Sequence, residues 1–238
     1  MASSLPEIAS DWALFLDLDG TLLDIAPRPD AVVVPPGLVD SLRGVATRLN
    51  GAAAIVSGRP AGDVDRFLAP LALPGGFGHG AEIRLPGGAP SPSEAARTPP
   101  VAWLDRLREA AAAWQGVIVE PKAHGVAMHF RLAPEREADV HDLMQRCAAE
   151  CEAFTLLSAH MAFELRPAGA NKALPVEVLM RHAPFGGRRP IFVGDDVTDE
   201  DGMEAARRHG GFGLHVGRDF RGGSAEVRAW LARAALAG

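Results

Sequence analysis

Three short apolar runs that each end in polar residues constrain the fold of this chain most strongly. They are ALFLDL at 13–18, AAAIV at 52–56 and PIFVG at 190–194. Apolar residues at helical spacing follow the first run over 36–49, and a second helix is expected over 63–68. Strands that alternate with helices in this way predict a parallel sheet with helical crossovers.

The last third of the chain resumes this alternation. We expect helices at 173–181, 200–208 and 224–236, and a short strand at 213–216. These elements extend the sheet that the first third begins.

The middle of the chain follows another pattern. Residues 86–100 are rich in Pro, Gly and Ser, which predicts a loop. A helix followed by two strands then occurs twice, with helices at 101–114 and 135–151 and strands at 117–120, 126–132, 154–157 and 162–166. We therefore expect an α/β fold, with a Rossmann-like parallel sheet core formed by residues 1–80 and 167–238 and an inserted α+β domain at 81–166.

Charge and composition exclude several classes of protein. The formal net charge of −6 argues against a nucleic-acid-binding protein, which usually carries a basic face. No stretch reaches the roughly 18 apolar residues that span a membrane, and residues 1–11 lack a signal-peptide pattern. We expect a cytoplasmic protein, a monomer or weak homo-oligomer, that acts on a small molecule. Cys147 and Cys151 are expected to be reduced thiols on one helix face.

Polar residues follow all three apolar runs. Asp17 and Asp19 close the first run, Ser57 follows the second, and Asp195 and Asp196 follow the third. Because the carboxyl ends of parallel strands share one edge, where such folds bind ligands, we expect these side chains to meet there.

Carboxylates gathered at one edge repel one another unless a cation lies between them. Mg²⁺ suits such a site, because it takes oxygen ligands and commonly uses one or two carboxylates with a phosphate oxygen. We expect Asp17 and Asp195 to bind it through their side chains and Asp19 through its backbone carbonyl. Thr21, Ser57 and Lys172 are the candidates for contacts with a phosphate.

This set of residues predicts phosphoryl transfer in two steps. Asp17 attacks phosphorus and forms an aspartyl-phosphate. Asp19 protonates the departing oxygen and then removes a proton from the water that hydrolyses the intermediate. Asp196 and Asp199 are expected to position the metal's waters or Lys172 from outside the first set of ligands.

Four motifs resemble those of the haloacid-dehalogenase-like hydrolases. They are DLDGTL at 17–22, SGR at 57–59, Lys172 and GDDVTDE at 194–200, in the order that this superfamily has them. The resemblance implies that Asp17 is the nucleophile and Asp19 the acid and base. It also implies phosphate contacts from Ser57 and Lys172, and magnesium ligands at Asp17, Asp19 and Asp195.

Two further segments narrow the resemblance. GHGAE at 78–82 and ELRPAGANKA at 164–173 are similar to the trehalose-phosphate phosphatases, whose inserted cap domain binds the sugar. The resemblance implies sugar contacts from the following residues: Glu120, Lys122, Glu164 and Arg166, with His79, Gly80, Arg131 and Asn171 as further candidates. From the residues alone, charges that alternate along a hairpin more often form a solvated face. We treat His124, His129 and His160 as surface or packing residues.

The expected activity is therefore hydrolysis of trehalose 6-phosphate with Mg²⁺. A related phosphatase acting on sucrose phosphate or mannosyl-glycerate phosphate is the main alternative, and a phosphomutase could share the same core residues. A non-catalytic sugar-phosphate sensor is a hypothesis of another class. It would be expected to have lost Asp17, Asp19 or Asp195, and all three are present.

Overall fold

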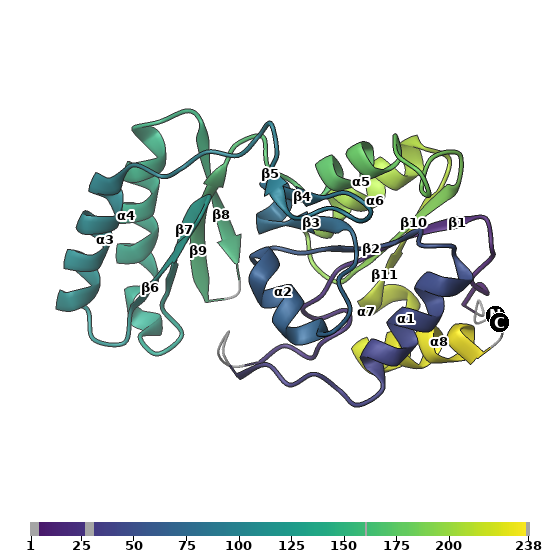
Figure 1. Cartoon of the computed structure of the whole chain (residues 1–238). Coiled ribbons are helices and arrows are strands. Elements are labelled where there is room, and N and C mark those ends of the chain that lie inside the picture. The colour runs from purple at the N-terminus through teal and green to yellow at the C-terminus, as the bar shows by residue number, and fades with distance from the viewer. Residues whose placement is uncertain (1–4, 27–30, 160, 237–238) are drawn as a thin grey trace. The chain divides into compact units, whose positions relative to one another are not determined.

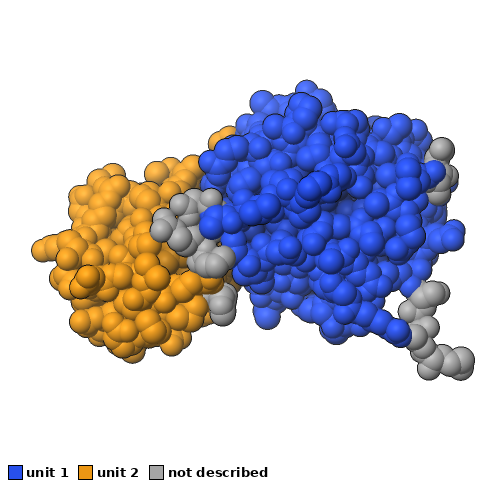
Figure 2. All heavy atoms as spheres, turned by 90° about the horizontal axis from the view of Figure 1, so that it is seen from below, with its two compact units in different colours: residues 1–91, 171–238 blue, residues 92–170 orange. Residues whose placement is uncertain are grey.

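The computed structural model describes residues 5–26, 31–159 and 161–236. His160, one of the histidines considered above, lies outside these residues. The chain forms two compact units (Figures 1 and 2). Unit 1 comprises residues 1–91 and 171–238, and unit 2 comprises residues 92–170.

A seven-stranded sheet forms the centre of unit 1, in the order β11-β10-β1-β2-β3-β4-β5. Neighbouring strands from β11 to β3 are parallel, and β4 is antiparallel to β3. The strands are β1 (Trp12–Leu16), β2 (Ala53–Val56), β3 (Gly75–Phe77), β4 (Glu82–Arg84), β5 (Ser91–Pro92), β10 (Arg189–Gly194) and β11 (Phe212–His215). The predicted parallel core is confirmed.

The register of the central strands brings their carboxyl ends to one level. Leu16, the last residue of β1, is paired with Val193 of β10 and with Ile55 of β2. All five residues of β1 are buried, as expected of a strand covered on both faces. The residues that follow these strands therefore emerge side by side at one edge.

Helices cover both faces of this sheet. Its helices are α1 (Leu38–Arg48), α2 (Ala61–Leu68), α5 (Ala173–Leu179), α6 (Asp199–Arg208), α7 (Val216–Asp219) and α8 (Ser224–Leu236). α1 packs against α8 and α5 against α6, and the two pairs lie on opposite faces of the sheet (Figure 1). A short 3₁₀ turn at Gly78–Gly80 follows β3.

Unit 2 has its own sheet and its own apolar core. Its strands are β6 (Ile118–Lys122), β7 (Gly125–His129), β8 (Phe154–Ala159) and β9 (Ala162–Pro167), antiparallel in the order β6-β7-β9-β8. Helices α3 (Val101–Ala113) and α4 (Glu137–Ala149) pack against it, and a 3₁₀ turn at Pro134–Arg136 precedes α4. The core between helices and sheet includes Trp103, Met128 and Leu165. The expected repeat of a helix and a hairpin is confirmed.

The two units divide at residues 91/92 and 170/171, whereas the sequence analysis placed the insertion at 81–166. The difference arises because residues 82–84 form β4, which is hydrogen-bonded to β3 of the core sheet. β5 continues the same sheet within the Pro- and Gly-rich stretch that we expected to be a loop. This stretch therefore begins in unit 1.

Candidate active site

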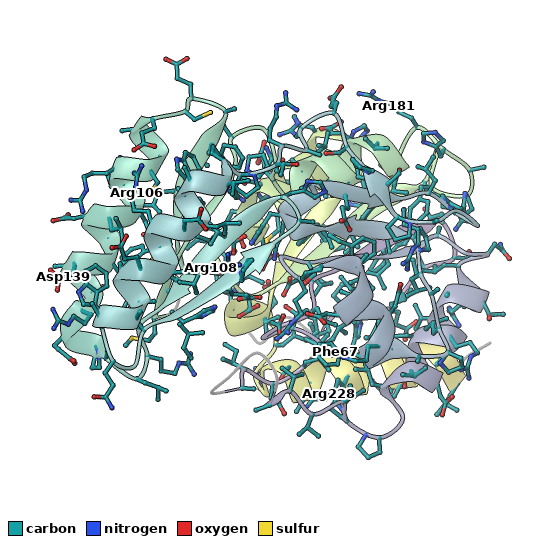
Figure 3. All side chains as sticks on the ribbon, turned by 60° about the vertical axis from the view of Figure 1, so that its left-hand side comes forward. Phe67, Arg106, Arg108, Asp139, Arg181 and Arg228 are labelled. Carbon is teal, nitrogen blue, oxygen red and sulfur yellow. The ribbon has the colours of Figure 1, made fainter. Side chains whose placement is uncertain are left out.

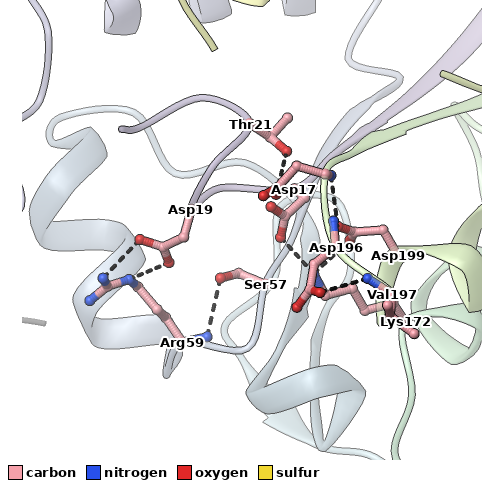
Figure 4. Close-up of polar contacts among 10 residues, drawn as sticks. Asp17, Asp19, Thr21, Ser57, Arg59, Lys172, Asp196, Val197 and Asp199 are labelled. Carbon is pink, nitrogen blue, oxygen red and sulfur yellow. Dashed lines mark hydrogen bonds and ion pairs between the residues drawn. The ribbon is translucent and has the colours of Figure 1, made fainter. Parts of the chain in front are cut away.

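Acidic side chains gather at the carboxyl edge of the unit 1 sheet (Figure 4). Asp17 directly follows β1, Asp195 directly follows β10, and Asp199 begins α6. One carboxylate oxygen from each of the three lies within 4.8 Å of the other two. Asp17 and Asp199 are buried and Asp195 is half-buried. The expected meeting of Asp17 and Asp195 is thus present, and Asp199 joins them.

Lys172 supplies the cation in this cluster. Its Nζ donates to Asp17 Oδ1 at 2.7 Å and to Asp199 Oδ1 at 2.6 Å, and its side chain is only 4% exposed. The preceding Asn171 accepts hydrogen bonds through Oδ1 from the backbone N–H groups of Ala173 and Leu174, both at 3.0 Å. Asn171 therefore caps the start of α5 and fixes the backbone from which Lys172 projects.

Asp199 shapes the loop that carries Asp195. Its Oδ2 accepts hydrogen bonds from the backbone N–H groups of Asp195 and Asp196, each at 3.0 Å. Because its Oδ1 is bonded to Lys172, both oxygens of Asp199 are engaged. Asp196 is exposed, and its Oδ1 accepts from the N–H of Val197 at 2.6 Å.

The cluster carries more negative charge than its one lysine balances. Burial, together with the charge of Asp199, raises the pKa of Asp17 well above its usual range, although Lys172 opposes the rise. Burial and Asp199 also raise the pKa of Asp195. Burial lowers the pKa of Lys172, but Asp17 and Asp199 outweigh it and the net shift is upward. A hard divalent cation fits this donor set, because carboxylate oxygens are its preferred ligands and its charge relieves the repulsion.

The loop after β1 holds Asp195 in place. Thr21 is buried, and its Oγ1 donates to Asp195 Oδ1 at 3.2 Å. Gly20 has a φ of +81°, and a Cβ at this position would lie 2.1 Å from Asp195 Oδ2. Glycine is thus required twice, for its backbone conformation and for the space that Asp195 fills. The Thr21 hydroxyl thus donates to Asp195 in this structure, and its expected contact with phosphate stays a prediction.

Asp19 lies apart from the cluster. Its carboxylate accepts two hydrogen bonds from the guanidinium of Arg59, Nε to Oδ2 at 2.6 Å and Nη2 to Oδ1 at 2.8 Å. Figure 4 shows Asp19 turned toward Arg59 and away from Asp17. Ser57 is buried nearby, and its Oγ accepts from the backbone N–H of Arg59 at 3.1 Å.

The segment 78–80 packs against the loop that carries Ser57. His79 is buried and has a φ of +55°, and its N–H donates to the backbone carbonyl of Ser57 at 3.1 Å. A Cβ on Gly58 would lie 2.5 Å from His79 Nε2, so the imidazole lies directly against that glycine. Gly80, with a φ of +91°, lies against the carbonyl of Asn171. These contacts join the start of α5 to the Ser57 loop.

The candidate sugar-binding residues of unit 2 share one face of its sheet. Strand pairing places Glu120 and Glu164 on either side of Ala127, on the face opposite Phe163 and Leu165 of the core. Two polar pairs lie on this face, Lys122 Nζ with Glu164 Oε2 at 2.5 Å and His129 Nε2 with Glu120 Oε2 at 2.7 Å. By the same alternation, Arg166 lies on this face of β9. Arg131 lies two residues beyond β7 and is half-buried.

Comparison with known proteins identifies the family. The sequence model of the trehalose-phosphatase family matches residues 15–232. The chain belongs to the trehalose-phosphatase family. It is 42% identical over 220 residues to a protein of Sinorhizobium fredii named probable trehalose-phosphate phosphatase, covering 90% of this chain and 81% of that one. It is 36% identical over 216 residues to the trehalose-6-phosphate phosphatase of Escherichia coli K12, covering 89% and 80%.

A solved structure agrees with membership of the trehalose-phosphatase family. A trehalose-6-phosphate phosphatase related protein superposes with a TM-score of 0.80 at 25% sequence identity, covering 94% of this chain and 97% of that one. The resemblance inferred from the motifs is therefore confirmed. Among the residues that the structure describes, no helix is both long enough and apolar enough to cross a membrane.

Sequence reasoning about this trehalose-phosphatase family member missed two contacts. Arg59 stands inside the SGR motif, and the sequence does not predict its pairing with Asp19. The expectation that His129 is a surface or packing residue does not include its bond to Glu120. The signal for Arg59 was its place in a motif beside Ser57. The signal for His129 was its alternation with Met128 of the core, which places it on the charged face of β7.

Proposed function

We propose that this chain is a phosphoric monoester hydrolase that converts trehalose 6-phosphate to trehalose and phosphate, a step of trehalose biosynthesis, through an aspartyl-phosphate on Asp17. The observation that carries the proposal is the position of Asp17. It is buried at the carboxyl end of the central strand, held by Lys172 at 2.7 Å, and close to a second carboxylate, Asp195. The names of the two relatives support the choice of substrate.

Asp17 and Asp195 are the residues that would hold Mg²⁺, with the backbone carbonyl of Asp19 as a third ligand. Bound there, Mg²⁺ would neutralise charge on the phosphoryl oxygens. Asp199 would support the site from outside the ligand set, through its bonds to Lys172 and to the backbone N–H groups of Asp195 and Asp196. Thr21 would orient Asp195, and Asp196 would position water at the exposed side of the site.

Asp17 acts as the nucleophile in the first step. Its carboxylate oxygen bonds to phosphorus while the bond from phosphorus to the sugar oxygen breaks, and Asp19 gives its proton to that oxygen. In the second step water attacks phosphorus, Asp19 takes the water's proton, and the bond from phosphorus to Asp17 breaks. Lys172 and Ser57 stabilise the phosphoryl oxygens throughout. The proton that Asp19 gives in the first step returns in the second.

Unit 2 is proposed to bind the sugar. Trehalose presents hydroxyl groups that both donate and accept, so a face with carboxylates and cations matches it. Lys122 and Glu164 are largely buried and paired, which indicates a built polar surface and not only a solvated one. Glu120 and Arg166 share this face, and Arg131 is a further candidate. In unit 1, His79, Gly80 and Asn171 remain candidates at the edge of the Ser57 loop.

Phosphate release from trehalose 6-phosphate, with and without Mg²⁺, tests the proposal. Glucose 6-phosphate and sucrose 6-phosphate should be measured beside it. We expect rapid release from trehalose 6-phosphate in the presence of Mg²⁺ and little with EDTA. Asp17→Asn should abolish release while the circular dichroism spectrum stays native. Faster release from sucrose 6-phosphate, or full activity of Asp17→Asn, would contradict the proposal.

A further inference from the structure

Contacts within unit 1 hold both the backbone and the side chain of Arg59. Its backbone N–H donates to Ser57 Oγ at 3.1 Å, and its carbonyl accepts from the N–H of Gly78 at 2.9 Å. Its guanidinium carbon lies 5.1 Å from the centre of the Phe67 ring of α2, which Figure 3 labels. The side chain is 15% exposed. Both the backbone and the guanidinium of Arg59 are therefore fixed by contacts within the unit.

The fork of Arg59 is directed at Asp19. Nε and Nη2 each donate to a different oxygen of the carboxylate, at 2.6 and 2.8 Å. A bidentate pair of this kind fixes the orientation of a carboxylate as well as its position. The proposed reaction needs one oxygen of Asp19 for proton transfer, and in this structure Arg59 binds both. Because Asp19 is turned toward Arg59 and away from Asp17, it must present one oxygen to the leaving group in each cycle, while the other can keep its hydrogen bond to Arg59.

We propose that Arg59 is the positioning residue for Asp19. It acts as a pivot, holding one carboxylate oxygen while the other turns to the leaving group and later to water. This inference rests on the proposed function. Nε and Nη2 of Arg59 both donate to Asp19, and this positioning role requires no contact of Arg59 with the phosphoryl group.

The leaving group separates this role from a phosphate contact. The sugar oxygen of trehalose 6-phosphate needs a proton to depart, whereas p-nitrophenolate departs without one. The value of kcat/KM reports the steps up to the formation of the aspartyl-phosphate. For Arg59→Met we expect kcat/KM to fall about ten- to a hundredfold with trehalose 6-phosphate, the scale of a misplaced catalytic group. With p-nitrophenyl phosphate we expect a change of less than about twofold.

A double-mutant cycle with Asp19→Asn shows whether Arg59 acts through Asp19. Asp19→Asn alone should lower kcat/KM for trehalose 6-phosphate about a hundredfold or more, the usual contribution of general acid catalysis. Adding Arg59→Met to Asp19→Asn should then change it by less than about twofold. If Arg59 bound phosphate directly, Arg59→Met would lower kcat/KM by the same factor in the wild-type protein and in Asp19→Asn, and with both substrates. That result would overturn the inference.

Two further variants complete the experiment. Arg66→Met is the matched control, because the Arg66 guanidinium also lies 5.1 Å from the Phe67 ring but is exposed and paired with Asp63. Arg66→Met should leave kcat/KM unchanged for both substrates. Arg59→Lys keeps the charge without the fork, and a selective loss on trehalose 6-phosphate is again expected. If Arg59→Met does not fold, Arg59→Lys provides the test. An equal fall in kcat/KM for both substrates would refute the proposal that Arg59 positions Asp19.

The proposed function and the inference fail in different ways. If the wild-type protein does not hydrolyse trehalose 6-phosphate, the proposed function fails. If it does, and Arg59→Met lowers kcat/KM equally for both substrates, only the role of Arg59 is wrong.

Discussion

Lys172 is the residue on which the buried charges of unit 1 depend. It stands between Asp17 and Asp199, and all three side chains are at most 5% exposed. A buried ion pair adds little stability over an apolar pair, but the removal of one partner leaves an uncompensated charge. The variant that removes Lys172 therefore tests the geometry of the cluster directly.

For Lys172→Met we expect the free energy of unfolding to fall by about 3–5 kcal/mol without Mg²⁺, because two carboxylates are left buried together. Urea denaturation measures this. Arg43→Met is the control, since Arg43 pairs with Asp40 on the surface and both side chains are about half or more exposed, at 49% and 79%. Its removal should cost less than about 1 kcal/mol. Equal losses in the two variants would contradict the buried cluster.

Gly20 tests the contact between the first loop and Asp195. In Gly20→Ala the new Cβ would overlap Asp195 Oδ2, so we expect a strong loss of Mg²⁺ affinity as well as of stability. Gly37→Ala is the matched control, because Gly37 has a φ of +79° and a Cβ there would meet no atom of the described residues within 4 Å. Backbone strain alone should lower the free energy of unfolding of Gly37→Ala by about 1–2 kcal/mol and leave its activity unchanged. Isothermal calorimetry with Mg²⁺ and urea denaturation separate the two effects, and normal Mg²⁺ binding by Gly20→Ala would contradict the geometry.

At the scale of elements, the loop after β1 is tied to the last helix. Asp24 accepts a hydrogen bond from Ser224, the first residue of α8, and pairs with Arg228 at 3.1 Å. Arg228 also donates to the carbonyl of Leu22 at 3.1 Å. The bond from Ser224 and the contact with Arg228 lower the pKa of Asp24. The helix thereby helps to fix the loop that follows β1.

Asp24→Asn should weaken this connection in a pH-dependent way. A carboxylate whose pKa is lower in the folded state adds stability above its unfolded pKa, and that stability is lost as the pH falls through the folded value. At pH 7 the variant should be less stable by at most about 1 kcal/mol, since the pair is exposed. The difference from wild type should shrink as the pH falls through the lowered folded-state pKa of Asp24 and disappear below it. A difference that persists unchanged below that pKa would show that Asp24 acts through packing.

Sequence reasoning recovered the long elements better than the short ones. β1, α1 and α8 have continuous apolar runs or clear helical periods, and their bounds differ little from those expected. β3 is Gly-Gly-Phe and β5 is only Ser91–Pro92, and neither carries a strand pattern. These strands exist because the edge of a sheet offers them backbone hydrogen bonds, which no local pattern records.

The same distinction holds at the site. The meeting of Asp17, Asp195 and Lys172 could be predicted because each follows a recognisable strand or stands in a recognisable motif. The pairing of Asp19 with Arg59 could not, because the direction in which a side chain turns depends on neighbours 40 positions away in the sequence. Asp199 was expected to support the site from outside, and its bonds to Lys172 and the loop after β10 agree with that expectation.

At the scale of the whole molecule, the chain forms two units with separate cores, and the proposed function assigns the chemistry to unit 1 and sugar recognition to unit 2. If unit 2 binds the sugar, Lys122→Ala should raise KM for trehalose 6-phosphate about tenfold, because Glu164 loses the Lys122 cation and the sugar loses a donor. The kcat/KM for p-nitrophenyl phosphate should not change. Asp139→Ala is the control, as Asp139 lies on α4 and pairs with Arg136 (Figure 3). If Lys122→Ala lowered kcat/KM by the same factor for both substrates, the assignment of sugar binding to unit 2 would be contradicted.

The direct test of the mechanism is to find the phosphoryl group on the protein. Turnover of trehalose 6-phosphate with Mg²⁺ should be quenched with acid within one cycle, and the peptides of the digested protein analysed by mass spectrometry. A covalent intermediate predicts phosphorylation of the peptide that contains Asp17, on that residue, which disappears as phosphate is released. Release of phosphate at the full rate with no phosphorylated Asp17 at any time would contradict it.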